Sequence, residues 1–593
     1  MFKDRTINER YNVNISGGGK MARYYVAGSY SIDRGILKND GANNFENNIN
    51  IKRYSLRSNI NMKFTPTTDA VIRLHGDMDK RVGPLEDGAD YFDQARNASP
   101  VDFPAYYPKD PGDPKTYYAN HILFGSDPQM ELVNPYANMV KGFRESSTSI
   151  MLAQIELSQK LDFITKGLSA RTLFNINRQS YYDYSRSTTP FLYSMSKNIL
   201  TGEKELTNLN PKLGKSFLEY SPGESTVSSS MYSETALTYN RIFSEKHDVS
   251  GIFVFTARDT QYGNADDLIS SLPFRNLTFA GRLTYGYDSK YFAEANFGYW
   301  GSERFAKQER WGFFPSMGLG WMVSNENFMK AYEKTVTKLK LKGTYGLTGN
   351  DQIGETDDRF FYMSRVNMND GNRASQFGTS LGYSRNGTSF TRYADPNITW
   401  EVSRKLNLGV ELGLFNDFDI QFDYFKERRS NILQYRSDIP STMGLQSIPS
   451  SNIGEAKSHG IEFSVDYSHF FSEDLWINAR GTLTYAANEY SRYEEPDYAS
   501  RNAPWLSHLG RSLSQPYGWI AERLFIDEED VRNAPEQTFG TYGPGDIKYK
   551  DINRDGVISM LDQVPIGLPT SPELICGFGF SLGFHQFDFS CFF

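Results

Sequence analysis

The chain has 593 residues, of which 15% are aromatic and 23% are charged, and its formal net charge is −8. An acidic chain of this kind lacks the basic stripe that phosphate binding requires, which argues against nucleic acid as a partner. No run of about 18 apolar residues is present that would form a membrane-spanning helix. The two cysteines, Cys576 and Cys591, are not spaced as a CxxC metal or redox pair.

Apolar and polar residues alternate in short runs along the whole chain. Side chains of a strand point to opposite faces with a period of two, so each run predicts a strand with one apolar and one polar face. The first eight runs lie at about residues 11–15, 24–32, 51–64, 70–79, 151–158, 168–181, 228–242 and 248–257. The others lie at about 274–285, 291–300, 312–323, 339–348, 404–414, 418–426, 461–467, 475–485, 575–584 and 587–593. The chain is thus expected to form about eighteen strands.

The clearest pair of runs lies between Arg404 and Lys426. The apolar members of the two runs are Leu406, Leu408, Val410, Leu412 and Leu414, and then Phe418, Ile420, Phe422 and Tyr424. Only residues 415–417 separate the two runs. Such a short break between two alternating runs predicts an antiparallel hairpin.

The connections between the runs alternate between short and long, and the one at 324–338 is expected to hold a helical turn. The long segments lie at about residues 80–147, 182–226, 349–398, 428–458 and 491–574. Outer-membrane barrels sort their loops in this way, with strands of about 10 residues between short periplasmic turns and long extracellular loops. The pattern predicts an all-β fold, a transmembrane antiparallel up-and-down β-barrel that passes the cell outer membrane many times. A soluble propeller or solenoid is the alternative, but it would show a repeat of about 40–50 residues, which the sequence lacks.

Several motifs, in order along nearly the whole chain, resemble those of SusC/RagA-type TonB-dependent outer-membrane transporters. They are Asn12–Gly18 (NVNISGG), Arg310–Ser316 (RWGFFPS), Tyr345–Asn350 (YGLTGN), Asp395–Glu401 (DPNITWE), Phe422–Phe425 (FDYF), Asn452–Glu455 (NIGE) and Gly545–Asp551 (GDIKYKD). The resemblance implies a barrel of about 22 strands with a plugged lumen. It covers the barrel alone, without the plug domain and TonB box of the family. Residues 1–593 are therefore expected to be one partial barrel, with one strand missing in front and three behind.

The resemblance also implies a function. The complete protein would import oligosaccharides or peptides as the SusC-like component of a SusCD-type complex. A SusD-like surface lipoprotein would cap its mouth, outer-membrane lipid would surround it, and the TonB complex would act through the missing N-terminal part. The partial barrel alone is expected not to transport, and no enzyme activity is expected. The alternatives are a TonB-dependent siderophore or cobalamin receptor, and a surface adhesin or glycan-binding β protein without a transport role.

The segment from Asp551 to Asp562 follows the pattern of an EF-hand loop. Oxygen ligands fall at the expected spacing, with side chains of Asp551, Asn553, Asp555 and Asp562, and the carbonyl of Val557. Asp at the last position is shorter than the usual bidentate Glu. The pattern predicts a cation, Ca²⁺, which would rigidify a long extracellular segment. A turn rich in Asn, Asp and Gly that binds no ion is the alternative.

Aromatic side chains in the long segments are candidates for binding cargo, because their faces stack on apolar faces of sugars or peptides. The candidates are Tyr106, Tyr107, Tyr117, Tyr118, Trp505 and Trp519. Packing among the loops, or against a partner, is the alternative for each of them. The motif Gly378–Gly382 (GTSLG) matches the nucleophile elbow of esterases, but it lies in a Gly- and Ser-rich stretch that predicts a flexible loop.

Overall fold

The computed structural model describes residues 2–38, 45–197, 202, 204–265, 267–354 and 358–593. The chain divides into two compact units. The first contains residues 1–161, 170–235 and 257–274, and the second contains residues 162–169, 236–256 and 275–593.

Among the described residues, eighteen strands belong to one antiparallel sheet. The first nine are β1 (Glu9–Gly18), β2 (Ala22–Arg34), β3 (Asn50–Thr65), β4 (Thr68–Gly83), β7 (Gly142–Lys160), β8 (Leu168–Ser187), β11 (Glu219–Phe243), β12 (His247–Tyr262) and β13 (Phe274–Tyr287). The other nine are β14 (Tyr291–Ser302), β15 (Trp311–Met322), β16 (Val336–Asn350), β19 (Glu401–Leu414), β20 (Phe418–Tyr435), β21 (Ser450–Ser472), β22 (Leu475–Arg492), β29 (Leu574–Phe584) and β30 (Phe587–Phe592). The predictions of an all-β antiparallel fold and of about eighteen strands are therefore confirmed.

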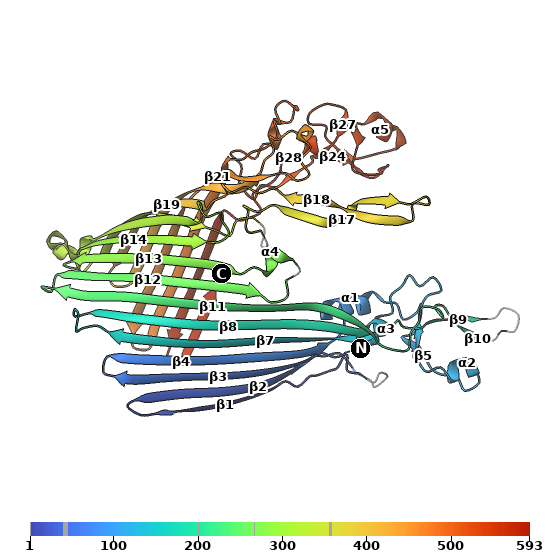
Figure 1. The fold of residues 1–593 in the computed structure, drawn as a ribbon, viewed down its shortest axis with the longest axis horizontal. Coiled ribbons are helices and arrows are strands. Elements are labelled where there is room, and N and C mark those ends of the chain that lie inside the picture. Colours follow the sequence, from blue (N-terminus) through green and yellow to red (C-terminus); the bar gives the residue numbers. More distant parts are fainter. Residues whose placement is uncertain (1, 39–44, 198–201, 203, 266, 355–357) are drawn as a thin grey trace. The chain divides into compact units, whose positions relative to one another are not determined.

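Neighbouring strands of the sheet follow the order of the chain. In the first unit, β1 to β4 and then β7 pair successively (Figure 1). In the second unit, β13 to β16 pair successively, followed by β19 to β22, β29 and β30. This up-and-down order is the one that short turns between successive alternating runs require.

The predicted hairpin is the pair β19 and β20. Its register joins Leu414 to Phe418, and Val410 to Phe422, so apolar residues face apolar residues across the two strands. The turn places Phe415 at φ 57° and Asn416 at φ 63°. Two successive positive φ values are typical of a type I′ turn, whose twist matches that of the flanking strands.

The long connections of the first unit contain small elements of their own. Between β4 and β7 lie α1 (Gly88–Asn97), β5 (Tyr106–Tyr107), α2 (Pro114–Tyr117), β6 (Leu123–Gly125) and α3 (Pro135–Val140). Between β8 and β11 lie β9 (Leu192–Lys197) and β10 (Lys204–Asn208), and between β12 and β13 lies α4 (Leu268–Ser271). None of the described helices is long and apolar enough to cross a membrane.

The connections of the second unit are built in the same way. The predicted helical turn is present as the 3₁₀ helices η1 (Val323–Asn325) and η2 (Asn327–Tyr332). The ribbon of β17 (Arg365–Phe377) and β18 (Tyr383–Arg392) follows β16, and η3 (Ser441–Met443) follows β20. Between β22 and β29 lie η4 (Pro504–Leu506), β23 (Tyr517–Gly518), β24 (Ala521–Leu524), α5 (Glu528–Asn533), β25 (Glu536–Gln537), β26 (Ile547–Tyr549), β27 (Val557–Ile558), η5 (Met560–Asp562) and β28 (Val564–Pro565).

Many strands are longer than the sequence predicts. Strand β11 has 25 residues and β21 has 23, against an expected length of about 10. Strands β20 and β21 take up both ends of the segment expected at 428–458, so that only residues 436–449 connect them. Strands β8 and β11 likewise reduce the segment expected at 182–226 to residues 188–218.

Three of the family-like motifs meet in one aromatic core of the second unit. Phe314 belongs to the motif Arg310–Ser316, and Ile398 and Trp400 belong to the motif Asp395–Glu401. These residues form a buried cluster together with Phe305, Ile353 and Phe361. The ring of Trp400 lies 5.4 Å from that of Phe314 and 5.3 Å from that of Phe305. Gly349, from the motif Tyr345–Asn350, faces the Phe314 ring so closely that a side chain there would collide with it.

Candidate functional site

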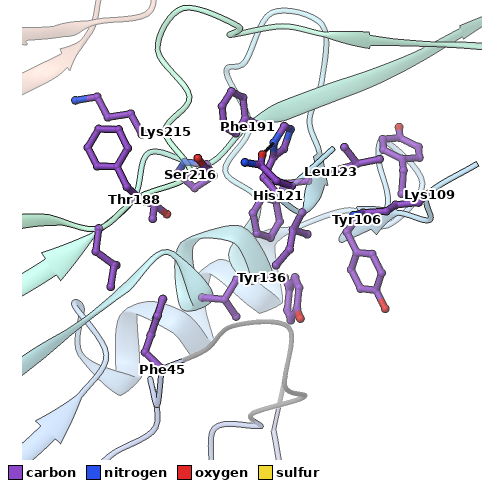
Figure 2. A pocket seen from close by; sticks show the side chains of 18 of the residues that line it. Phe45, Tyr106, Lys109, His121, Leu123, Tyr136, Thr188, Phe191, Lys215 and Ser216 are labelled. Carbon is purple, nitrogen blue, oxygen red and sulfur yellow. Dashed lines mark hydrogen bonds between the residues drawn. The ribbon is translucent and has the colours of Figure 1, made fainter. Parts of the chain in front are cut away.

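A cavity of about 870 Å³ lies among the long connections of the first unit (Figure 2). Its volume falls in the range of about 300–1,000 Å³ that is usual for small-ligand sites. Residues 106–140 and 188–218, which are far apart in the sequence, supply its lining together with Phe45. Four lining side chains are buried, namely Leu123, Phe124, Tyr136 and Val140. The predicted candidates Tyr106 and Tyr107 both belong to the lining.

A small sheet joins the two segments that build the cavity. Its strand order is β10-β9-β6-β5, so each segment contributes two strands. Strand β6 pairs in parallel with β9, which places Phe124 beside Leu192. Strand β5 pairs antiparallel with β6, which places Tyr106 beside Phe124 and Tyr107 beside Leu123.

Helix α3 is held against this sheet by Asn134. The Asn134 side-chain oxygen caps the helix by accepting hydrogen bonds from the amides of Tyr136 (3.0 Å) and Ala137 (3.1 Å). Its Nδ2 donates to the carbonyls of Ala105 and Gly125, both at 2.8 Å. Asn followed by Pro135 is a strong helix start, because the cap satisfies free amides and proline needs none. The cap therefore fixes where Tyr136 meets the cavity.

His121 lies at the centre of the lining (Figure 2). Its ring stacks on Phe191 with 3.9 Å between centroids, and its Nε2 lies 2.9 Å from the Tyr193 hydroxyl. Burial, and then the positive charge of Lys109, hold the pKa of His121 below its ordinary value. Both effects favour the neutral ring, which offers a stacking face and a hydrogen bond without a charge.

The other aromatic candidates lie outside the lining of this cavity. Tyr117 and Tyr118 lie at the end of α2, are exposed, and pack edge to face with 5.1 Å between their centroids. In the second unit, the Trp505 indole donates to the carbonyl of Leu561 (3.0 Å), and the Trp519 indole donates to that of Ser559 (2.8 Å). The two tryptophans thus stabilise, through hydrogen bonds, the last residues of the EF-hand-like motif.

The EF-hand-like segment closes on its own backbone amides. The Asp551 carboxylate accepts hydrogen bonds from the amides of Arg554 (2.6 Å) and Gly556 (2.8 Å). Asn553 donates to Asp555 (2.8 Å), and Val557 lies in β27, which pairs with β25. Asp562 is fully buried and accepts three backbone hydrogen bonds. Across the described residues, no three His, Cys, Asp or Glu side chains form a group that could hold a metal ion. Calcium binding stays a prediction.

The esterase-like motif lies between two strands and has no elbow geometry. Gly378 has φ 93° and lies between β17 and β18, and Ser380 is exposed. A nucleophile elbow joins a strand to a helix, whereas a second strand follows here.

Sequence analysis missed most of the cavity. His121, Phe191, Lys109 and Lys215 line it, yet none of them carries a recognisable motif. They come together only because β6 pairs with β9, and such pairing between irregular segments leaves no periodic signal. The adjacent residues Tyr106 and Tyr107 are the part of the lining that the sequence predicted as candidates for binding cargo.

The family described as "TonB dependent receptor-like, beta-barrel" matches residues 134–555, which is more than half of the chain. The chain belongs to this family. As a TonB-dependent receptor barrel, it is a protein of the outer membrane. The predictions from the sequence on family, fold class and location are therefore confirmed.

Relatives and solved structures agree with this assignment. A TonB-dependent receptor of Formosa agariphila is 25% identical over 98% of this chain and 56% of its own length. The TonB-dependent receptor SusC of Bacteroides thetaiotaomicron is 23% identical over 98% of this chain and 57% of its own length. A structure of the RagAB peptide transporter shares the fold, with a TM-score of 0.65 and 16% identity over 99% of this chain and 61% of that chain. The chain spans about half the length of the curated relatives it matches.

Proposed function

We propose that the complete protein is the SusC-like component of an outer-membrane uptake system that imports oligosaccharides or peptides. The observation that carries this proposal is the aromatic cavity among the long connections of a TonB-dependent receptor barrel. Aromatic faces next to amide and hydroxyl groups suit cargo that has both apolar faces and polar edges. The similarity to SusC over nearly the whole chain supports the same proposal.

The mechanism we propose is capture, occlusion and release, without any bond being made or broken. A SusD-like surface lipoprotein delivers cargo to the long extracellular segments and covers them. The TonB complex, acting through a plug domain, opens the path to the periplasm. The residues of this chain supply the wall of the barrel and the receiving surface at its mouth.

Deletion of the gene tests this function. We expect the deletion strain to lose growth on one class of oligosaccharide or peptide as sole carbon source, and to recover when the full-length gene is returned. A returned gene without its TonB box should not restore growth.

Copurification of a lipoprotein with the tagged receptor would support the partner. Growth lost only under iron or cobalamin limitation would instead indicate a siderophore or cobalamin receptor. No growth defect, combined with retained glycan binding at the cell surface, would indicate an adhesin.

A further inference from the structure

The cavity of the first unit has an unusual distribution of charge. Its lining contains Lys109 and Lys215 but no Asp or Glu. The chain as a whole has a formal net charge of −8. A separate hollow of about 590 Å³ in the same long segment has the opposite character, with five carboxylates and no Lys or Arg. Those carboxylates belong to Glu86, Asp90, Asp93, Asp102 and Glu131. The five acidic side chains of that hollow are thus absent from the lining of the aromatic cavity, and Glu219 reaches it only as the ion-pair partner of Lys215.

Lys109 has no carboxylate partner. Its ammonium donates a hydrogen bond to the Ala119 carbonyl, and it forms no ion pair with any residue that the structure describes. An ammonium has three N–H donors, so two remain for a ligand. Its charge acts on the neighbouring His121 ring. A positive charge is therefore available at the cavity.

Lys215 has a partner that a ligand can share. Its Nζ lies 2.6 Å from Oε1 of Glu219, and the side chains are 39% and 45% exposed. Exposed ion pairs of this kind contribute little to stability. An anion entering the cavity can therefore approach Lys215 without breaking a strong interaction.

The uncharged part of the lining suits a sugar ring. The stacked rings of His121 and Phe191, and the half-exposed Tyr106, present aromatic faces to the apolar face of a pyranose. The hydroxyl of Ser216 and the amide of Asn120 supply hydrogen-bond donors and acceptors for sugar hydroxyls. The lining suits an extended peptide less well than a sugar ring. A peptide that binds by adding a strand would need a long free edge, and β5, the edge strand whose residues line the cavity, has only two residues.

We propose that this cavity binds an anionic oligosaccharide, with one carboxylate or sulfate group at Lys109, another at Lys215, and a sugar ring on the His121–Phe191 stack (Figure 2). This inference rests on the proposed function and deepens it, because it names the class of cargo.

Binding measured by calorimetry on the purified full-length receptor tests the proposal. The probes are uronate oligosaccharides of four to six sugars, their fully methyl-esterified forms, sulfated galactose oligosaccharides of the same length, and penta-glutamate. We expect a uronate or sulfated probe to bind about tenfold or more tightly than a neutral ester, because charge-assisted hydrogen bonds are the stronger ones. Lys109→Gln should reduce that advantage, with Lys215 left as the remaining cation of the lining, and should leave the affinity for the neutral ester unchanged. Lys115→Gln, on the neighbouring helix α2 and outside the lining, is the matched control and should have no effect.

Three outcomes would overturn the inference. They are equal affinity for charged and esterified sugars, tight binding of penta-glutamate alone, and no binding of any uronate or sulfated probe. A measurement of TonB-dependent uptake distinguishes a failure of this inference from a failure of the proposed function. Charge-dependent binding without TonB-dependent uptake removes the function but keeps the anion site. TonB-dependent uptake that Lys109→Gln does not affect keeps the function but removes the anion site.

Discussion

At the scale of single residues, the Asp562 carboxylate links separate parts of the EF-hand-like segment by accepting hydrogen bonds from their backbone amides. One carboxylate oxygen accepts hydrogen bonds from the amides of Ile552 (2.9 Å) and Asn553 (3.3 Å), and the other accepts from Ser559 (2.8 Å). The carboxylate is completely buried. Buried carboxylates are stable only when their hydrogen bonds are satisfied, and here backbone amides satisfy them.

We predict that Asp562→Ala unfolds this segment locally. Three amides, that of Asn553 buried and those of Ile552 and Ser559 partly buried, would lose their acceptor. A buried group left unsatisfied costs about 1–3 kcal/mol. Hydrogen exchange in the full-length protein should become faster at Ile552, Asn553 and Ser559. Glu528→Ala, at the exposed start of α5, is the control and should leave these rates unchanged. Unchanged exchange in Asp562→Ala would mean that the carboxylate does not hold the segment.

The same experiment tests calcium. If the segment binds a cation, added CaCl₂ should slow exchange at these amides in the wild type, and EGTA should reverse the effect. Asp551→Asn should abolish the response, because the first ligand of an EF-hand loop is a carboxylate. No response in the wild type would contradict calcium binding.

At the scale of elements, the sequence predicted the strands well and their ends poorly. Leu408 and Phe422 lie in strict alternations, which a two-faced environment enforces, so β19 and β20 were predicted correctly as an antiparallel hairpin. Strand β11 was expected from about residue 228 but begins at Glu219. Its first residues include Pro222 and Gly223, which indicate a turn in most sequences. Both faces of this stretch are polar and exposed, so no alternation identifies it. The cavity was missed for a related reason, since β5, β6, β9 and β10 are too short to carry a period.

The aromatic core of the second unit makes a prediction about packing. We expect Gly349→Ala to destabilise the protein by about 1–3 kcal/mol, the usual cost of overpacking. The new methyl group would meet the Phe314 ring, which cannot retreat because Trp400 packs against it. The check is the midpoint of urea unfolding, monitored by tryptophan fluorescence. Gly76→Ala in β4, where the methyl group meets no atom within 4 Å, is the matched control. Adding Phe314→Leu should recover part of the loss, and equal midpoints for both glycine variants would contradict the prediction.

At the scale of the whole molecule, the two faces of the sheet have different chemistry. On one face of β16, β19 and β20, ion pairs join Lys338 to Glu411 (2.8 Å) and Lys342 to Asp423 (3.2 Å). On the other face, large apolar side chains such as Leu408 (49% exposed) remain open. A soluble protein rarely leaves so many large apolar groups exposed in one patch. In an outer-membrane barrel, that face meets lipid and the charged face meets the interior.

The last prediction follows from this division. Leu408→Arg places a charge on the apolar face and should destabilise the full-length receptor by about 2–4 kcal/mol if it lies near the bilayer midplane. Gln421→Arg, on the charged face of the paired strand β20 and beside Glu411, should cost much less, because water or an acidic partner is available there. Folding into lipid vesicles against urea, read by the shift of the folded band on unheated gels, measures both. The two residues lie on opposite faces of adjacent strands, and Leu408 lies three positions from Glu411, which pairs with Gln421. A difference between them therefore reports the face where both positions lie well inside the hydrocarbon layer. Equal costs would mean that the apolar face does not meet lipid, and a larger cost for Gln421→Arg would mean that the assignment of the two faces is reversed.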